Sequence, residues 1–436
     1  MSSPSIVLDS SRLRRARAGV FGTFFVVGFL LAIWLVNIPA VRDRTGVSTA
    51  MLGWLILGLG LGSVVAMLAT GPLIDRRGSR LAALIGLGVA IVAVNLPGFA
   101  TTTLTLGVAL FLFGMGLGAA DVSMNHQAVV VERHYRRPIM SAFHAFFSLG
   151  GAVGAVLGAA AQALKLPLEL SFGGAAVIGL AFTVVLARVL LSRGDEDAVE
   201  ASLASEVNLA ADAAARAAES GATKNASRAE AGTEKSAQGE TAGIRRRIFV
   251  LALLSFLFML AEGVANDWSA LHAVEDLGVS AAAASLAYGT FAIAMTVGRL
   301  CSDRISLWIG ALNVVRVGSA LSIVGLGMVI VSNAYPLTLV GWALCGVGMA
   351  GIVPQLFTAT GNIDPARSGV LLSRVAGVGS VGLLAGPAII GFIGGAIGLS
   401  LAFVLPVVLC VAGLVLTPMV LPRRERPNPL INAAAN

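Results

Sequence analysis

The chain has 436 residues, of which 57% are hydrophobic and only 12% are charged, and its mean hydropathy is +0.88. A soluble domain carries about twice that charged fraction, so this composition excludes an ordinary soluble protein and indicates one embedded in a membrane. The formal net charge of +7 does not indicate a nucleic-acid-binding protein, because the basic residues are scattered over short loops rather than gathered in one patch.

Twelve apolar segments lie near the length of about 20 residues that a helix needs to cross a bilayer. In the first half of the chain they are expected at 18–41, 49–70, 81–99, 104–129, 139–162 and 170–192. In the second half they are expected at 248–268, 282–301, 307–331, 336–359, 369–393 and 398–421. The chain is therefore predicted to be an all-α membrane protein with 12 transmembrane helices in two six-helix halves, residues 18–192 and 248–421.

Three segments are predicted to lie outside the membrane: an N-terminal tail (1–17), a linker (193–247) and a C-terminal tail (422–436). The linker is rich in Ala, Glu, Ser and Thr and has no apolar run, so we expect it to be flexible and only partly helical. Arginine concentrates in these segments and in every second loop, which predicts that both termini are cytoplasmic. Three arginines inside the predicted spans are expected to extend to the membrane surface: Arg299, Arg316 and Arg374.

Polar side chains inside the predicted spans need an explanation, because a charge at the bilayer centre costs at least about 2.5–3.5 kcal/mol. Asp121 and Asn125 are one helical turn apart and share a face of the fourth span. Counting outward from the turn near residues 134–135 places Asp121 level with Ser148, and Asn125 level with His144. A carboxylate and an imidazole would then lie close together near mid-membrane, where a desolvated carboxyl can exchange protons near neutral pH. The alternative is a structural polar contact between the fourth and fifth spans.

Two further groups of polar residues lie in or beside the spans. Glu262 and Asn266 share a face at the end of the seventh span. Glu262 is expected either to line the substrate cavity or to have a structural role. Amides and hydroxyls near an aromatic side chain, in the first and tenth spans, suit a polyhydroxylated or zwitterionic ligand. We assign proton coupling to Asp121, His144 and Glu262. We assign the substrate cavity to Trp34, Asn37, Asn125, Ser148, Asn266, Gln355 and Thr358.

The segment between the second and third spans, residues 71–80, reads Gly-Pro-Leu-Ile-Asp-Arg-Arg-Gly-Ser-Arg. It resembles the Gly-x-Leu-x-Asp-Arg-x-Gly-x-Arg signature loop of the major facilitator superfamily of secondary transporters. The resemblance implies a cytoplasmic latch, in which Asp75 faces the positive end of a helix from the other half while the arginines pair with nearby acids. A partial copy at 298–304 keeps the first Gly, the Asp and one Arg, and indicates two related halves. The implied cytoplasmic gate comprises Gly71, Asp75, Arg76, Gly78, Arg80, Asp303 and Arg304.

The stretches 116–125 and 143–150 are similar to those of the fucose permease branch of this superfamily. Together with 262–268 and 348–355 they also resemble its bacterial relatives of the YbjJ type. Proton-coupled sugar import in the permease implies a proton-carrying acid at the position of Asp121. The permease has a second acid in its first span, which this chain lacks, so the resemblance leaves the substrate class open.

These expectations combine in a secondary active transporter that moves a small polar solute, with sugar as one candidate, by proton-coupled alternating access across a bacterial inner membrane. Two alternatives stay open: a proton-driven exporter of drugs or metabolites, and a transporter-like substrate sensor. Such exporters typically have a Gly-Pro motif in the fifth span, which here has Gly-Gly without Pro. The sequence has no catalytic, metal-binding or nucleotide-binding motif, so neither an enzyme nor a cofactor is expected. The expected partners are the solute, protons and the lipid bilayer, without nucleic acid, and the protein is expected to be a monomer.

Overall fold

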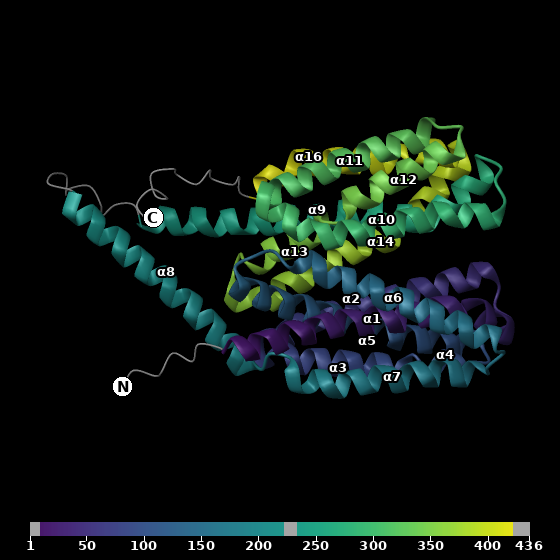
Figure 1. Ribbon diagram of the computed structural model, residues 1–436, viewed down its shortest axis with the longest axis horizontal. Helices are drawn as coiled ribbons and strands as arrows, with labels where there is room; N and C mark the ends of the chain where they lie inside the picture. Colours follow the sequence, from purple (N-terminus) through teal and green to yellow (C-terminus); the bar gives the residue numbers. More distant parts are fainter. Residues whose placement is uncertain (1–8, 222–232, 422–436) are drawn as a thin grey trace. The chain divides into compact units, whose positions relative to one another are not determined.

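The computed structural model describes residues 9–221 and 233–421, and these residues are helical apart from short turns, with no β-strand among them (Figure 1). This confirms the predicted all-α class. The first half contains α1 (Ser10–Thr45), α2 (Thr49–Arg77), α3 (Ser79–Ala93), α4 (Leu96–Phe99), α5 (Thr103–Tyr135), α6 (Met140–Ala163) and α7 (Leu168–Val189). After α8 (Arg193–Gly221), the second half contains α9 (Thr233–Glu275), α10 (Ala281–Ile309), α11 (Ala311–Val331), α12 (Tyr335–Met349), α13 (Ile352–Gly361), η1 (Pro365–Arg367), α14 (Ser368–Ile397), α15 (Leu399–Ala402), α16 (Val404–Leu416) and η2 (Thr417–Met419).

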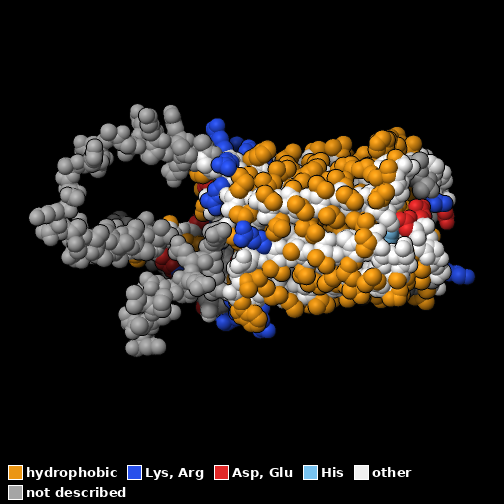
Figure 2. Space-filling model, turned by 90° about the horizontal axis from the view of Figure 1, so that it is seen from above, with side chains coloured by type: hydrophobic (Ala, Val, Ile, Leu, Met, Phe, Trp, Pro, Cys, Tyr) orange, Lys and Arg blue, Asp and Glu red, His pale blue; other side chains and the backbone are white. Residues whose placement is uncertain are grey.

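Every predicted span falls mainly on helix. Eleven helical stretches of the described chain are long and apolar enough to cross a membrane. The remaining predicted span, 282–301, falls on α10, a helix of 29 residues. Hydrophobic side chains cover most of the described surface that is visible in Figure 2, while Lys and Arg gather towards its two ends. This distribution suits helices that pass through hydrocarbon and end in water.

The two signature segments lie inside helices rather than in loops, which corrects the predicted boundaries. Residues 71–77 form the last turns of α2, and residues 298–304 lie within α10. The turns themselves are at Gly78 (φ +85°) and Gly310 (φ +81°), a backbone conformation that is nearly restricted to glycine. The second copy therefore does have a turn glycine, about one helical turn later than the motif spacing predicts.

The helices form two compact units. Unit 1 comprises Met1–Arg136, Phe146–Phe249 and Thr360–Gly377. Unit 2 comprises Arg137–Ala145, Val250–Ala359 and Val378–Asn436. The first part of α14 therefore belongs to unit 1, although it lies in the second half of the sequence. Likewise, the first residues of α6 belong to unit 2.

Glycines set the close packing of helices within each unit. In unit 1, α5 packs against α2 and α3, and a side chain at Gly114 would overlap the backbone of Leu59 on α2. In unit 2, α12 packs against α10 and α11, and a side chain at Gly318 would overlap the backbone of Gly348. Helices in a membrane associate by such close approach, because burial of apolar surface contributes little between them.

The segment predicted to be a flexible linker begins as an ordered helix. α8 starts at Arg193, and α9 starts at Thr233, which is still inside the predicted linker. In α8 the side chains of Glu196 and Val199 are buried, so its first two turns pack onto unit 1. The predicted N-terminal tail is likewise helical from Ser10. Residues 222–232 of the linker and the predicted tail 422–436 lie outside the described residues.

Candidate functional site

Asp121 and Asn125 form a hydrogen-bonded pair on α5. Asn125 is buried, and its side-chain Nδ2 donates to the backbone carbonyl of Asp121 (2.9 Å) and to the Asp121 carboxylate (3.3 Å). Asp121 itself is half-buried. Among the described ion pairs within unit 1, none includes Asp121. This carboxylate is thus held by a neutral amide and can change its protonation state without breaking an ion pair in its own unit.

The other predicted members of this cluster are divided between the units. His144 belongs to unit 2, where its ring centroid lies 6.2 Å from that of Phe357. Ser148, one helical turn later on α6, belongs to unit 1 and is half-buried. The predicted approach of His144 to Asp121 joins two units and stays a prediction.

Glu262 on α9 forms an ion pair with Arg299 on α10, with 3.1 Å between the carboxylate and guanidinium atoms. The two side chains are only 17% and 11% exposed, respectively, so this pair is largely shielded from solvent. Sequence reasoning assigned Arg299 to the membrane surface, but the structure turns it inward to an acid on the neighbouring helix. Asn266, one turn beyond Glu262, is half-buried.

The uncharged cavity candidates make packing contacts within their units. Trp34 and Asn37 are both 1% exposed, and the Asn37 amide donates to Ser171 on α7 (3.2 Å). Gln355 is buried and accepts a hydrogen bond from Ser306 on α10 (3.4 Å). Contacts of this kind hold helices together. The cavity role of these residues, and of the half-buried Thr358, stays a prediction.

The first signature segment contacts the start of α14. The carboxylate of Asp75 accepts hydrogen bonds from the backbone N–H groups of Gly369 (2.9 Å) and Val370 (3.3 Å). A helix N-terminus presents unpaired N–H groups and a partial positive charge, so it binds an anion favourably. We call this contact the α14 latch. Gly71 lies beside it, and a side chain there would overlap that of Ser373.

The remaining first-half gate residues are placed differently. Arg76 is exposed. Arg80 donates to the backbone carbonyl of Ala187 near the end of α7, and not to an acid as the family resemblance implies. Gly78 is buried and lies against the start of α8. A methyl group at this position would lie 3.0 Å from the Cβ of Arg193.

The second signature segment makes the corresponding contact in unit 2. Asp303 is 7% exposed, and it accepts hydrogen bonds from the backbone N–H groups of Ser141 (3.0 Å) and Ala142 (2.7 Å) at the start of α6. We call this contact the α6 latch. Arg304 is exposed. The partial copy of the motif therefore places its acid at a helix N-terminus just as the fuller copy does.

Sequence reasoning missed three residues that connect α8 with the segment before the α14 latch: His126, Arg133 and Glu196. His126 and Arg133 lie on α5 and contact residues 361–368, and Glu196 lies on α8. One signal could have located the start of α8. Ser192 and Asp195 exchange hydrogen bonds between side chain and backbone, and Ser-x-x-Asp is a recognisable helix-start pattern.

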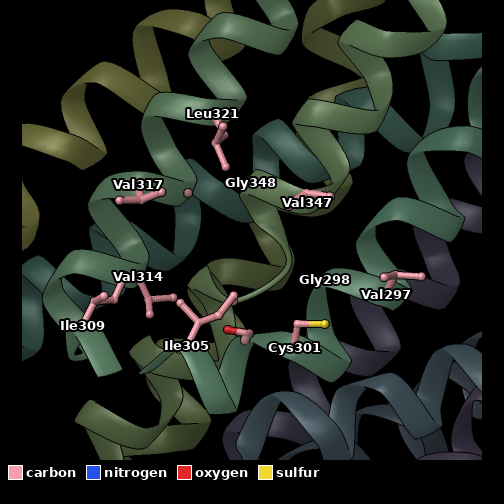
Figure 3. Close-up of a pocket in the computed structure, with 13 residues that line it drawn as sticks. Val297, Gly298, Cys301, Ile305, Ile309, Val314, Val317, Leu321, Val347 and Gly348 are labelled. Carbon is pink, nitrogen blue, oxygen red and sulfur yellow. The ribbon is translucent and has the colours of Figure 1, made fainter. Parts of the chain in front are cut away.

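A separate cavity of about 190 Å³ lies in unit 2 between α10, α11 and α12 (Figure 3). Its walls are formed by aliphatic side chains and glycines, with Cys301 and Ser302. None of the predicted proton-coupling or substrate-cavity residues lines it, and an apolar wall does not suit a polar solute. Among the described residues, no group of three or more His, Cys, Asp or Glu side chains could hold a metal ion.

Comparison with known proteins identifies the family. The sequence profile of the Major Facilitator Superfamily matches residues 20–310 and 251–436. An uncharacterized MFS-type transporter of Yersinia pestis is 36% identical over 397 residues, covering 90% of this chain and 91% of that protein. The membrane protein MosC of Rhizobium meliloti is 28% identical, covering 89% and 86%.

Solved structures show the same fold at low sequence identity. The transporter FucP in its outward conformation superimposes with a TM-score of 0.70 at 16% identity, covering 94% of this chain and 98% of FucP. The proton:xylose symporter XylE, bound to 6-bromo-6-deoxy-D-glucose, gives a TM-score of 0.72 at 14% identity, covering 95% and 97%. The chain belongs to the Major Facilitator Superfamily of membrane transporters.

Proposed function

We propose that this transporter couples the movement of a small polar solute to protons, and that Asp121 carries the proton. The observation behind this proposal is the contrast between two acids within the spans. Glu262 is balanced by Arg299 at 3.1 Å, whereas Asp121 has only the Asn125 amide as a described partner in its unit. Within a membrane, an ionised acid without a cationic partner is less stable than one in an ion pair. Such an acid therefore gains more from binding a proton.

The proposed cycle follows from that charge. Ionised Asp121 opposes closure of a dry cavity around it, because an unpaired buried charge is costly. A proton neutralises the carboxyl and so permits the two halves to change which side of the membrane they open to. Solute binding that favours the protonated form links the two movements. A polar, uncharged solute fits the predicted cavity residues that carry amide or hydroxyl groups, among them Asn125, Asn266 and Thr358.

A sugar is the first solute class to test. FucP is described as a fucose:proton symporter and XylE as a proton:xylose symporter, but at 14–16% identity they support only the fold of this chain. The proposal also places the protein in a bacterial inner membrane with both termini in the cytoplasm. The arginine-rich ends of the predicted topology support that orientation.

The test uses purified full-length protein in liposomes that contain a pH-sensitive dye. Sugars, sugar acids, amino acids and cationic drugs are added outside, and two signals are recorded: proton movement, and exchange of labelled for unlabelled solute at equal pH. Asp121→Asn is expected to abolish solute-driven proton movement and to retain exchange, because exchange needs no net proton transfer. Asp267→Asn, an exposed acid on α9, is the matched control.

Proton movement that survives in Asp121→Asn would refute the assignment of the proton to this residue. Proton movement opposite in direction to the solute would indicate antiport, as expected for the alternative of a proton-driven exporter. Loss of both signals in Asp121→Asn, with an unfolding temperature well below that of the unmodified protein, would make the Asp121–Asn125 pair a structural contact.

A further inference from the structure

The base of α8 is held to unit 1 by buried polar contacts. Glu196 is 2% exposed, and its carboxylate accepts hydrogen bonds from the backbone N–H (3.2 Å) and the hydroxyl of Ser79, the first residue of α3. Gln127 on α5 donates to the same carboxylate (3.4 Å) and exchanges two hydrogen bonds with the backbone of Leu191. Glu196 therefore binds the N-terminus of α3, as Asp75 binds that of α14.

A second set of contacts anchors the residues just before Glu196. Arg12 on α1 donates to the carbonyls of Val189 (2.6 Å) and Leu190 (2.7 Å), and it pairs with Asp195 at 2.7 Å. Although burial alone would raise the pKa of Asp195, hydrogen bonds from Arg12 and Ser192 lower it overall, so this acid stays ionised. The α8 base, defined here as residues 192–200, is thus fixed to α1, α3 and α5.

Two side chains of α5 lie between the α8 base and the segment that carries the α14 latch. The Nε2 atom of His126 lies 3.0 Å from the hydroxyl of Ser368, and its Nδ1 atom lies 3.9 Å from the carboxylate of Glu196. Arg133 donates to Asn362 (2.6 Å) and to the carbonyl of Gly361, and it lies 3.9 Å from Glu200. The α8 base and residues 361–368 therefore share their contacts on α5.

We propose that Glu196 is a positioning residue of the transport cycle, and that the α8 base acts as a proton-sensitive strap that favours the closed α14 latch. While the α8 base is docked, Glu196 lies 3.9 Å from His126 and Glu200 lies 3.9 Å from Arg133, so the α8 base limits the movement of these two side chains. On their other side, the same two side chains bind residues 361–368. When the α8 base leaves, both side chains gain freedom and their bonds to residues 361–368 weaken. This inference rests on the alternating-access cycle of the proposed function, but not on the role of Asp121.

The proton sensitivity follows from the surroundings of Glu196. Burial raises the pKa of Glu196 to about 7. Hydrogen bonds from Ser79 and the charge of Arg193 favour the carboxylate and lower the pKa, but burial has the larger effect. Glu200 on the same helix adds a like charge, and His126 on α5 is the other titratable group within reach. A released Glu196 would return to its ordinary pKa of 4.5. The docked form thus binds the proton more tightly, so docking is strongest at low pH and weakens as the pH rises through about 7.

The size of the effect follows from the same two values. With a pKa of about 7 when docked and 4.5 when released, the ratio of docked to released α8 falls about tenfold between pH 6 and pH 8.5. Glu196→Gln, which mimics the neutral acid, should remove this dependence. Glu206→Gln is the matched control, because Glu206 lies further along α8, is exposed, and undergoes the same chemical change.

The experiment measures two distances by pulsed electron spin resonance in the full-length protein. Cysteines are introduced at exposed positions in a Cys301→Ala background, where the two buried native cysteines are left in place. Labels at Arg77 and Ala201 report docking of the α8 base. Labels at Arg77 and Arg367 report the α14 latch.

From pH 6 to pH 8.5, the ratio of the long-distance to the short-distance population is expected to rise for both label pairs, by about tenfold for the α8 pair. Glu196→Gln should remove the pH-dependent change in distance for both label pairs, and Glu206→Gln should leave that change in place for both. Glu196→Ala should lengthen both distances at every pH. An α8 pair that moves while the latch pair does not would overturn the coupling. A pH response that persists in Glu196→Gln would overturn the assignment to Glu196 and point to His126. Neither result depends on a transported solute, so a failed transport assay would not be mistaken for a failure of this inference.

Discussion

The sequence motif and the geometry predict different relative strengths for the two latches, so a measurement can decide between them. The motif is fuller in the first half, so motif strength alone would make Asp75 the more important acid. The geometry predicts the opposite order. Asp303 is 7% exposed and accepts bonds of 2.7 and 3.0 Å, whereas Asp75 is half-buried and accepts bonds of 2.9 and 3.3 Å. We therefore expect Asp303→Asn to weaken its latch more than Asp75→Asn weakens the other.

The magnitudes follow from the contacts. Asparagine keeps one acceptor oxygen but replaces the other by an amide that cannot accept a backbone N–H. Hydrogen bonds to a charged group contribute about 1.5–3 kcal/mol each, and an anion at a helix N-terminus contributes a further 0.3–1 kcal/mol, approximately. Losing one such bond and the charge should cost about 3 kcal/mol at the more buried Asp303 and about 2 kcal/mol at Asp75. These values correspond to changes in a local opening equilibrium of about 150-fold and about 30-fold.

Hydrogen–deuterium exchange reports this equilibrium directly, because the donors are backbone N–H groups. Exchange is followed in lipid nanodiscs for peptides that cover residues 141–142 and 369–370. Asp303→Asn should speed exchange at 141–142 about 150-fold, and Asp75→Asn at 369–370 about 30-fold. Each variant should leave the other site unchanged and so serve as its control. A larger effect for Asp75→Asn, or one variant that loosens both sites, would refute the reasoning.

Two further predictions concern stability, measured as the free energy of unfolding in mixed detergent micelles. Gly78→Ala and Gly398→Ala both force alanine into a backbone conformation that costs about 1–3 kcal/mol. Only at Gly78 would the new methyl group also press on Arg193 of α8, so Gly78→Ala should lower the free energy of unfolding more. Equal losses in the two variants would contradict the docking of α8. Glu262→Gln and Arg299→Gln should each cost about 3 kcal/mol or more, because each leaves a shielded charge unpaired. The double variant should recover part of this loss, and strictly additive losses would argue against the ion pair.

The fold could be predicted from the sequence because membrane spans leave a strong one-dimensional signal. Runs of about 20 apolar residues are typical of membrane-crossing helices, and each predicted span falls mainly on helix. The end of α10 could not be predicted in this way. Asp303 and Arg304 interrupt the apolar run and indicated a loop, but the helix continues to Ile309. It tolerates the acid because two N–H groups at the start of α6 satisfy the carboxylate, and that contact is invisible to hydropathy.

The candidate site was only partly predictable. Asp121 and Asn125 lie one turn apart on one helix, so their pairing follows from helical periodicity. The partner of Glu262 lies 37 positions later, and the partner of Glu196 lies 117 positions earlier. Such pairings depend on which helices are neighbours and how each is rotated about its axis. Composition alone therefore predicted a solvated α8 base, although its contacts are buried.

The comparison of the two latches shows what the signature motif requires physically. Asp75 lies three positions before its turn glycine and Asp303 lies seven positions before Gly310, yet each carboxylate reaches two N–H groups at a helix start. The requirement is a carboxylate at a helix N-terminus, and the distance to the turn can vary by a whole helical turn. The latches differ in their surroundings. In unit 1, His126 lies between Glu196 and Ser368 at the start of α14, whereas Asp303 is held in unit 2. If the α8 base acts as we infer, a rise in pH should lower the protection of residues 369–370 from exchange and leave that of residues 141–142 unchanged, where protection compares each measured rate with the intrinsic rate at the same pH.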